Sequence, residues 1–144
     1  MRIYLDNCCF NRPFDDQGQI RVRLEAEAKL AIQGRVQAGR LELVWSYILD
    51  YENRFNPFDE RRNAIQEWKS RAKVNVRVSQ KVLEKAGNLA QCGIRAKDAL
   101  HLACAIEGKC KYFLTTDDVI LTKMADCREV SVADPTEFIV RERK

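Results

Sequence analysis

Short apolar segments with strand character alternate along this chain with longer segments of helical composition. The expected strands are residues 2–5, 41–45, 74–78, 112–115 and 129–132. The expected helices are residues 20–38, 47–55, 59–72, 80–91 and 96–107, with a short helix from about 118 and a last element that begins at Asp134-Pro135. This alternation predicts an α/β fold, a single three-layer α/β/α domain with a mainly parallel central sheet and helices on both faces.

No internal repeat or low-complexity linker divides the 144 residues, and this length is typical of one domain, residues 1–144. Hydrophobic residues make up 46% of the chain and charged residues 32%, which allows a packed core and argues against disorder. No apolar run approaches the roughly 20 residues that span a bilayer, and the N-terminus lacks the apolar region of a secretory signal. We therefore expect a cytoplasmic protein without a membrane segment.

Six cysteines could indicate a disulfide framework or a zinc site, but their spacing fits neither. Cys8 and Cys9 are adjacent, the other four are scattered, no C-x-x-C pair occurs and the chain has a single histidine. We expect free cysteines that act mainly as small buried hydrophobic residues.

Two acidic residues stand at the ends of expected strands. Asp6 directly follows the strand 2–5, and Asp117 comes shortly after the strand 112–115. In an open parallel sheet, ligands bind in the crevice outside the carboxyl ends of the strands, so the two carboxylates are expected to converge there. Each could instead only cap the helix that follows, which is a common role of aspartate.

A third acid, Asp98, lies in the expected helix 96–107, where nearly every other position is apolar. A buried carboxylate costs several kcal/mol unless a cation or hydrogen bonds compensate it. The helix dipole favours an acid in the first turn by about 1 kcal/mol, but it does not account for the apolar flanks. Asp98 is therefore a candidate ligand. Glu52, in the expected helix 47–55, is a fourth candidate, and Asp50 is its rival for the same role.

Other α/β proteins with acids at strand ends fit this sequence less well. A phosphatase of the Asp-x-Asp type would need a second aspartate at position 8, which is Cys8, and the pattern also differs from that of a receiver domain. Neither G-x-x-x-x-G-K-[ST] nor G-x-G-x-x-G occurs, so a nucleotide site built on a glycine loop is not supported.

Four segments resemble, in order and in separation, the four acidic motifs of the PIN-domain family. They are YLDN at 4–7, SYILDYE at 46–52, KDALHLA at 97–103 and FLTTD at 113–117. The resemblance covers almost the whole chain. It implies that the catalytic residues are Asp6, Glu52, Asp98 and Asp117, and that the metal ligands are Asp6, Asp98 and Asp117. The fourth acid could instead be the adjacent Asp118.

The PIN-domain family contains nucleases, including VapC-type toxins of toxin–antitoxin pairs. The resemblance therefore implies a metal-dependent endoribonuclease that hydrolyses phosphodiester bonds of RNA, with an antitoxin protein as a partner and a homodimeric state. The alternative is a catalytically weak or inactive PIN-fold module that binds RNA or protein. Four clustered acids argue against this alternative, because a scaffold has no reason to retain clustered charge.

Elementary chemistry agrees with a metal site made of carboxylates. Clustered carboxylates repel one another unless a divalent cation neutralises them, and Mg²⁺ or Mn²⁺ suits oxygen ligands. A metal-bound water can serve as the nucleophile, so no other nucleophile is needed. Asn7 and Thr115 are candidates for hydrogen-bonding the ligating carboxylates. His101, three residues after Asp98, is expected to be a packing residue with a bonded ring nitrogen, although it could orient a ligand or contact substrate.

An acidic crevice repels phosphate, so RNA must be held by cations around it. The net charge of +4 is compatible with a polyanionic partner. The candidates, chosen because each lies near one of the acids in the sequence, are Arg12, Arg54, Arg95, Lys97 and Lys123. Single-stranded or loop RNA is the expected target, because a crevice at strand ends admits a splayed strand more easily than a duplex.

Overall fold

A parallel sheet forms the centre of the computed structural model, which describes residues 1–143. Within these residues the sheet has five strands in the order β3-β2-β1-β4-β5, and every neighbouring pair is parallel. The strands are β1 (Arg2–Leu5), β2 (Glu42–Ser46), β3 (Val74–Val76), β4 (Tyr112–Leu114) and β5 (Ser131–Ala133). The predicted α/β architecture is confirmed, and the sheet is parallel throughout.

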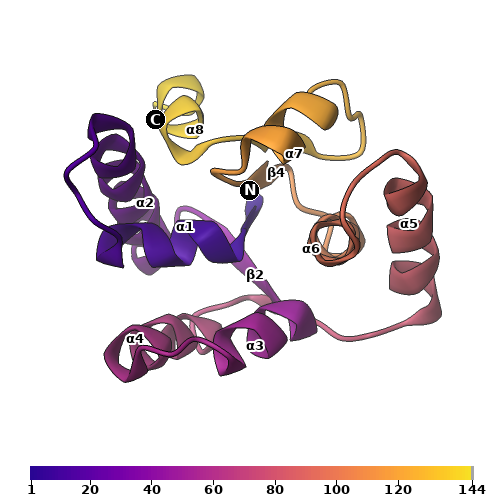
Figure 1. The fold of residues 1–144 in the computed structure, drawn as a ribbon, viewed down its shortest axis with the longest axis horizontal. Coiled ribbons are helices and arrows are strands. Elements are labelled where there is room, and N and C mark those ends of the chain that lie inside the picture. The colour runs from indigo at the N-terminus through magenta and orange to yellow at the C-terminus, as the bar shows by residue number, and fades with distance from the viewer. Residues whose placement is uncertain (144) are drawn as a thin grey trace.

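Helices cover both faces of the sheet (Figure 1). The helices are α1 (Asn7–Asn11), α2 (Ile20–Gln37), α3 (Tyr47–Arg54), α4 (Asp59–Lys69), α5 (Gln80–Gln91), α6 (Ala96–Glu107), α7 (Asp118–Lys123) and α8 (Pro135–Arg141), with a 3₁₀ turn η1 (Arg12–Phe14). Helices α2 and α8 pack together on one face, and α5 and α6 pack together on the other. None of the helices in the described part of the chain is both long and apolar enough to cross a membrane.

Local sequence signals explain most helix boundaries. Ser79 caps α5 by accepting a hydrogen bond from the backbone of Val82, and Asp134 caps α8 in front of Pro135. Helix α6 spans the predicted residues 96–107. The segment after Asp6 differs from the expectation, because it forms α1 and η1 before the loop begins. This short helix is held by the Asp6 cap and by burial of its apolar side chains, and it is too short to show a periodic pattern.

The register of the sheet brings three loops to one edge. Strand β1 lies in the centre, with Tyr4 opposite Val44 of β2 and opposite Phe113 of β4. The residues that follow these parallel strands therefore meet at the same edge, and the backbone amide of Asp6 donates to the carbonyl of Leu114 at 2.9 Å. The fold thus places the loops after β1, β2 and β4 side by side.

All six cysteines are free thiols, as the sequence predicted. Cys9, Cys104 and Cys110 are buried in the core, where burial raises the pKa of the Cys104 and Cys110 thiols to about 12. These three side chains are small buried residues, as predicted, whereas Cys92 is exposed and Cys8 and Cys127 are partly exposed.

Candidate metal centre

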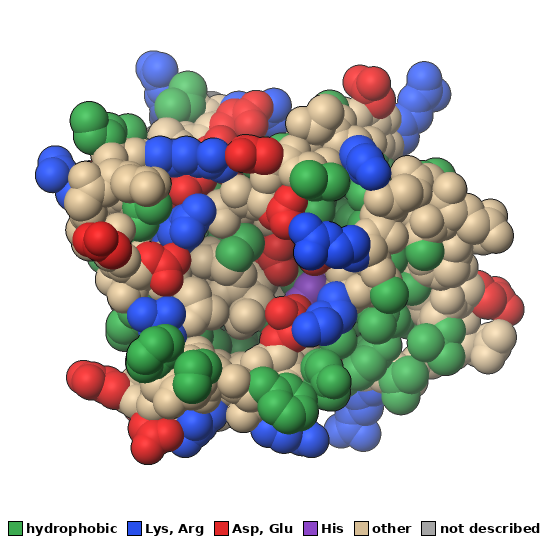
Figure 2. Space-filling model, in the orientation of Figure 1, with side chains coloured by type: hydrophobic (Ala, Val, Ile, Leu, Met, Phe, Trp, Pro, Cys, Tyr) green, Lys and Arg blue, Asp and Glu red, His purple; other side chains and the backbone are tan. Residues whose placement is uncertain are grey.

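Acidic side chains and the single histidine gather at a hollow on the face seen in Figure 2, with Lys and Arg side chains beside them. The side chains that the sequence proposed come from the loops and helices at the carboxyl edge of the sheet. They follow β1 and β4, lie on α3, and lie in the first turn of α6. The structure shows which of these side chains lie close together.

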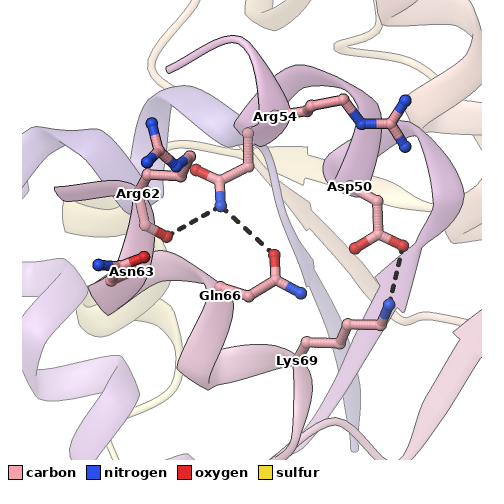
Figure 3. A pocket seen from close by; sticks show the side chains of 7 residues that line it. Asp50, Arg54, Arg62, Asn63, Gln66 and Lys69 are labelled. Carbon is pink, nitrogen blue, oxygen red and sulfur yellow. Dashed lines mark hydrogen bonds and ion pairs between the residues drawn. The ribbon is translucent and has the colours of Figure 1, made fainter. Parts of the chain in front are cut away.

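Helix α3 turns Asp50 and Glu52 in different directions, as expected for residues two positions apart. The carboxylate of Asp50 accepts a hydrogen bond from the indole of Trp45 at 2.9 Å and pairs with Lys69 at 3.0 Å. It lies in a pocket between α3 and α4 (Figure 3). Glu52 instead turns toward α6, so the rival position Asp50 does not join the acids.

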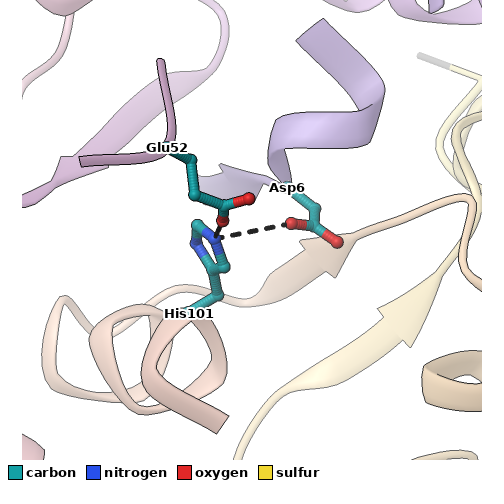
Figure 4. Close-up of side chains that lie close together, drawn as sticks. All are labelled: Asp6, Glu52 and His101. Atoms are coloured by element: carbon teal, nitrogen blue, oxygen red, sulfur yellow. Dashed lines mark hydrogen bonds and ion pairs between the residues drawn. The ribbon is translucent and has the colours of Figure 1, made fainter. Parts of the chain in front are cut away.

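Asp6, Glu52 and His101 converge on one point (Figure 4). One potential ligand atom of each side chain lies within 4.8 Å of the others. The Nε2 atom of His101 is 3.8 Å from Oδ1 of Asp6 and hydrogen-bonds to Oε1 of Glu52. Two carboxylates and an imidazole nitrogen at this spacing form a donor set that fits a divalent cation.

The carboxylate of Asp6 is held by its surroundings. It is only 5% exposed, accepts from the backbone amide of Asn7 at 2.8 Å, and accepts from the hydroxyl of Thr115 at 2.8 Å. The same Thr115 oxygen accepts from the backbone amide of Asp117 at 3.1 Å. Thr115 therefore links the loops after β1 and β4 and lies beside the Asp6 carboxylate, the position expected for it.

His101 is fully buried, as a packing residue would be, but both of its ring nitrogens have partners. Its Nδ1 lies 2.6 Å from the hydroxyl of Tyr4, which lies 2.6 Å from the hydroxyl of Ser46. The Tyr4 ring is stacked on Phe113 with centroids 5.4 Å apart. The ring orientation is therefore fixed from behind, and Nε2 is directed into the acidic group.

The ionisation of Glu52 and that of His101 depend on each other. Burial alone would raise the pKa of Glu52, but the hydrogen bond and charge of His101, with Lys97 and Asn7, lower it below its usual range. Burial alone would lower the pKa of His101, but Glu52 and Asp6 raise it. Asn7 thus lies beside Glu52, and its buried Oδ1 has no hydrogen-bond partner among the described residues.

Asp98 and Asp117 lie beside this group but outside its tightest part. Burial, and then the charges of Asp6 and Asp117, raise the pKa of Asp98. Asp98 lines a cavity of about 390 Å³ together with Glu52, one helical turn before His101. Asp117 caps α7 through its Oδ1 atom, which accepts from two backbone amides at 2.9 and 3.3 Å. The neighbouring Asp118 is exposed and paired with Arg21 at 2.8 Å.

The five cations proposed from the sequence have different surroundings. Arg95 and Lys97 line the same cavity as Glu52 and Asp98. Arg54 lines the pocket between α3 and α4. Arg12 is occupied by ion pairs with Glu25 and Asp15, and Lys123 donates to the carbonyl of Gly93 at 2.8 Å. Of the cations chosen for their nearness in sequence to an acid, Arg95 and Lys97 therefore lie at the cavity and Arg12 does not.

The geometry on α3 leads to a first prediction. Glu52→Gln should weaken Mn²⁺ binding by roughly 10- to 100-fold, because it removes a charge beside Asp6 and His101. Asp50→Asn on the same helix should leave Mn²⁺ affinity unchanged, since its carboxylate is engaged by Trp45 and Lys69. Isothermal titration calorimetry on the two variants measures the difference. Loss of affinity in Asp50→Asn alone would move the centre to the other side of α3.

No protein-family model and no curated protein match this sequence. Solved structures do share the fold. One chain of the VapBC2 complex from Rickettsia felis, bound to a promoter DNA fragment, has a TM-score of 0.58 at 14% identity, covering 93% of this chain and 98% of that one. A toxin–antitoxin complex from Klebsiella pneumoniae gives 0.58 at 17% identity, covering 92% and 97%. VapBC-1 from nontypeable Haemophilus influenzae gives 0.60 at 16% identity, covering 94% and 99%.

The chain therefore has a VapC-like PIN-domain fold. At these sequence identities the likeness shows the fold alone, and it confirms the three-layer α/β/α architecture that the alternation of strands and helices predicted.

Proposed function

We propose that this protein is a metal-dependent endoribonuclease that hydrolyses phosphodiester bonds of RNA and acts as the toxin of a toxin–antitoxin pair. The observation that supports this best is the convergence of Asp6, Glu52 and His101 at the carboxyl edge of the sheet. The charges of Asp6 and Asp117 lie close enough to Asp98 to raise the pKa of its carboxyl group. We assign catalysis to Asp6, Glu52, Asp98 and Asp117, and metal binding to Asp6, Asp98 and Asp117 with Glu52 and His101 added.

The cofactor in this proposal is Mg²⁺ or Mn²⁺. When bound, such an ion supplies a water of lowered pKa and neutralises charge on the scissile phosphate. Oxygen ligands suit both ions, whereas an imidazole nitrogen suits Mn²⁺ better than Mg²⁺. The presence of His101 in the donor set therefore favours Mn²⁺.

The chain itself does the positioning. Thr115 and the amide of Asn7 hold the Asp6 carboxylate, and Tyr4 holds the ring of His101. Lys97 and Arg95, at the cavity that contains Asp98, can bind the phosphates on either side of the scissile bond. The acids alone would repel RNA, so these cations are needed for substrate affinity.

The three structural neighbours are toxin–antitoxin complexes, and this supports an antitoxin as the partner of the present chain. We further propose a homodimer. A protein that binds RNA or a partner without cleaving would have the same fold, so cleavage has to be measured directly.

The test is cleavage of a labelled RNA hairpin with a single-stranded loop, with Mn²⁺, with Mg²⁺ and with EDTA. We expect cleavage in the loop only with a divalent ion, and none of a DNA duplex. Binding should weaken with salt at a log–log slope of roughly −0.7 per phosphate contacted. Binding of RNA without cleavage under any metal condition would support the inactive module instead, and salt-independent binding would contradict the assigned cations.

A further inference from the structure

Side chains of three kinds follow one another around the axis of helix α3. At about 100° per residue, Asp50 and Arg54 share one side, Tyr51 and Phe55 the next, and Glu52 the side after that. The contacts agree, because Asp50 and Arg54 line the pocket toward α4 while Glu52 contacts α6. The aromatic pair therefore lies between the acidic group and the pocket.

Tyr51 and Phe55 are large aromatic side chains on the surface. Tyr51 is 46% exposed and Phe55 is 66% exposed. Their rings meet edge to face with centroids 5.1 Å apart, so each supports the other and leaves a ring face open. Exposed aromatic rings beside cations are the usual surface on which proteins stack unpaired bases.

The pocket beyond the aromatic pair is polar and positively charged (Figure 3). Its volume is about 390 Å³, and its lining residues are Asp50, Asn53, Arg54, Arg62, Asn63, Gln66 and Lys69. Three of these lining side chains are cations and one is a carboxylate. Among residues 1–143, Arg54 makes no ion pair, so its guanidinium is available to a phosphate.

One buried polar atom in this pocket has no partner. Asn53 is 2% exposed, and its amide nitrogen donates to the carbonyl of Arg62 at 3.0 Å. Its Oδ1 atom accepts no hydrogen bond from the described residues. An unsatisfied buried acceptor costs about 1–3 kcal/mol, which an N–H group of a ligand would recover. A nucleobase edge offers such a group.

We propose that Tyr51 and Phe55 stack an unpaired base of a single-stranded RNA, and that the pocket on their far side binds the adjoining nucleotide through Arg54 and Asn53. The inference rests on the proposed function for its choice of ligand, and it gives the RNA strand a direction across α3, away from the acidic group. Charge favours RNA over a protein partner, because the pocket is cationic and RNA is a polyanion.

The first experiment measures affinity without cleavage. The Asp98→Asn protein and its double variants with Tyr51→Leu or Phe55→Leu are titrated with a fluorescent single-stranded RNA in Mn²⁺. Leucine keeps an apolar side chain but removes the stacking face, so each variant should bind roughly 10-fold or more weakly. Phe14→Leu is the matched control, since Phe14 is 41% exposed but lies on η1 and not on α3, and it should bind like the parent.

The second experiment identifies stacking as the cause. A set of RNAs, each with one abasic nucleotide, is titrated against the Asp98→Asn protein, here the parent, and against its double variant with Phe55→Leu. One abasic position should weaken the parent about as much as Phe55→Leu does, and should weaken the Phe55→Leu variant little further. Equal losses in both proteins would overturn the proposal.

The outcomes separate this inference from the function on which it rests. Full RNA affinity in both double variants, with full cleavage when each leucine substitution is made in the natural protein, would overturn the stacking surface and leave the nuclease intact. No RNA binding by the parent would overturn both. Loss of association with a second copy or with a partner protein, with RNA affinity unchanged, would reassign the surface to a protein interface.

Discussion

Asp98→Asn should lower the rate of RNA cleavage by roughly a thousandfold. Removing a carboxylate from a metal centre removes part of the several kcal/mol by which the ion stabilises the transition state, and about 4 kcal/mol corresponds to that factor. Asp98 is the most informative of the acids, because the structure shows no hydrogen bond to its carboxylate among the described residues, whereas Asp6 caps α1 and bonds to Thr115. Single-turnover cleavage with Mn²⁺ in excess measures the effect.

The same variant should not destabilise the metal-free protein. Burial, Asp6 and Asp117 raise the pKa of Asp98, so its ionised form opposes folding at neutral pH and its removal relieves repulsion. We expect an unchanged or slightly higher Tm without metal, and a smaller Tm increase on adding Mn²⁺. Asp118→Asn is the matched control, since its carboxylate pairs with Arg21 at the surface, and it should retain activity. Full activity in Asp98→Asn would refute the assignment of this centre.

Much of the fold could be predicted because the local signals agree with the tertiary structure. Ser79, Asp134 and Pro135 mark helix starts in the sequence, and the apolar run of 96–107 marks α6. The edge strands were less well predicted. Strand β3 ends at Val76 and β5 begins at Ser131, because the length of a strand depends on its pairing partner, which a local pattern does not contain.

The candidate metal centre could be predicted in part, because strand topology fixes where some of its residues lie. Asp6 and Asp117 follow neighbouring parallel strands, so topology alone brings them near each other. The direction of His101 Nε2 could not be predicted, because it depends on contacts with Tyr4 and Glu52 that are distant in sequence. The spacing of three residues between Asp98 and His101 was the available signal, and it was also compatible with simple packing. The ion pair of Arg12 with Glu25 could not be predicted either, because it also depends on tertiary contacts.

Lys29 illustrates a further property that only the structure reveals. It lies on α2 with 3% exposure, its ammonium group 5.1 Å from the ring centre of Phe10 and 5.8 Å from that of Trp68. Among residues 1–143 it forms no ion pair. Burial lowers the pKa of Lys29 from its ordinary value of 10.5 to about 7, although the Cys9 thiol opposes this.

Lys29→Met should therefore stabilise the protein most at and below neutral pH. The folded pKa is about 7 and the unfolded pKa about 10.5, so the unfolded state binds more protons between these values. The free energy of unfolding of the natural protein should rise as pH increases from about 7 to about 10. At one pKa unit per about 1.4 kcal/mol, the full difference in the free energy of unfolding between the two proteins is on the order of several kcal/mol, reduced by the cation–π contacts that methionine forfeits.

Methionine fits the same aromatic slot, so the pH dependence of stability in the Lys29→Met variant should lack the component due to Lys29. Urea unfolding of both proteins at several pH values measures the gap between them, which should narrow with rising pH. Parallel curves would show that Lys29 keeps its charge in the folded state.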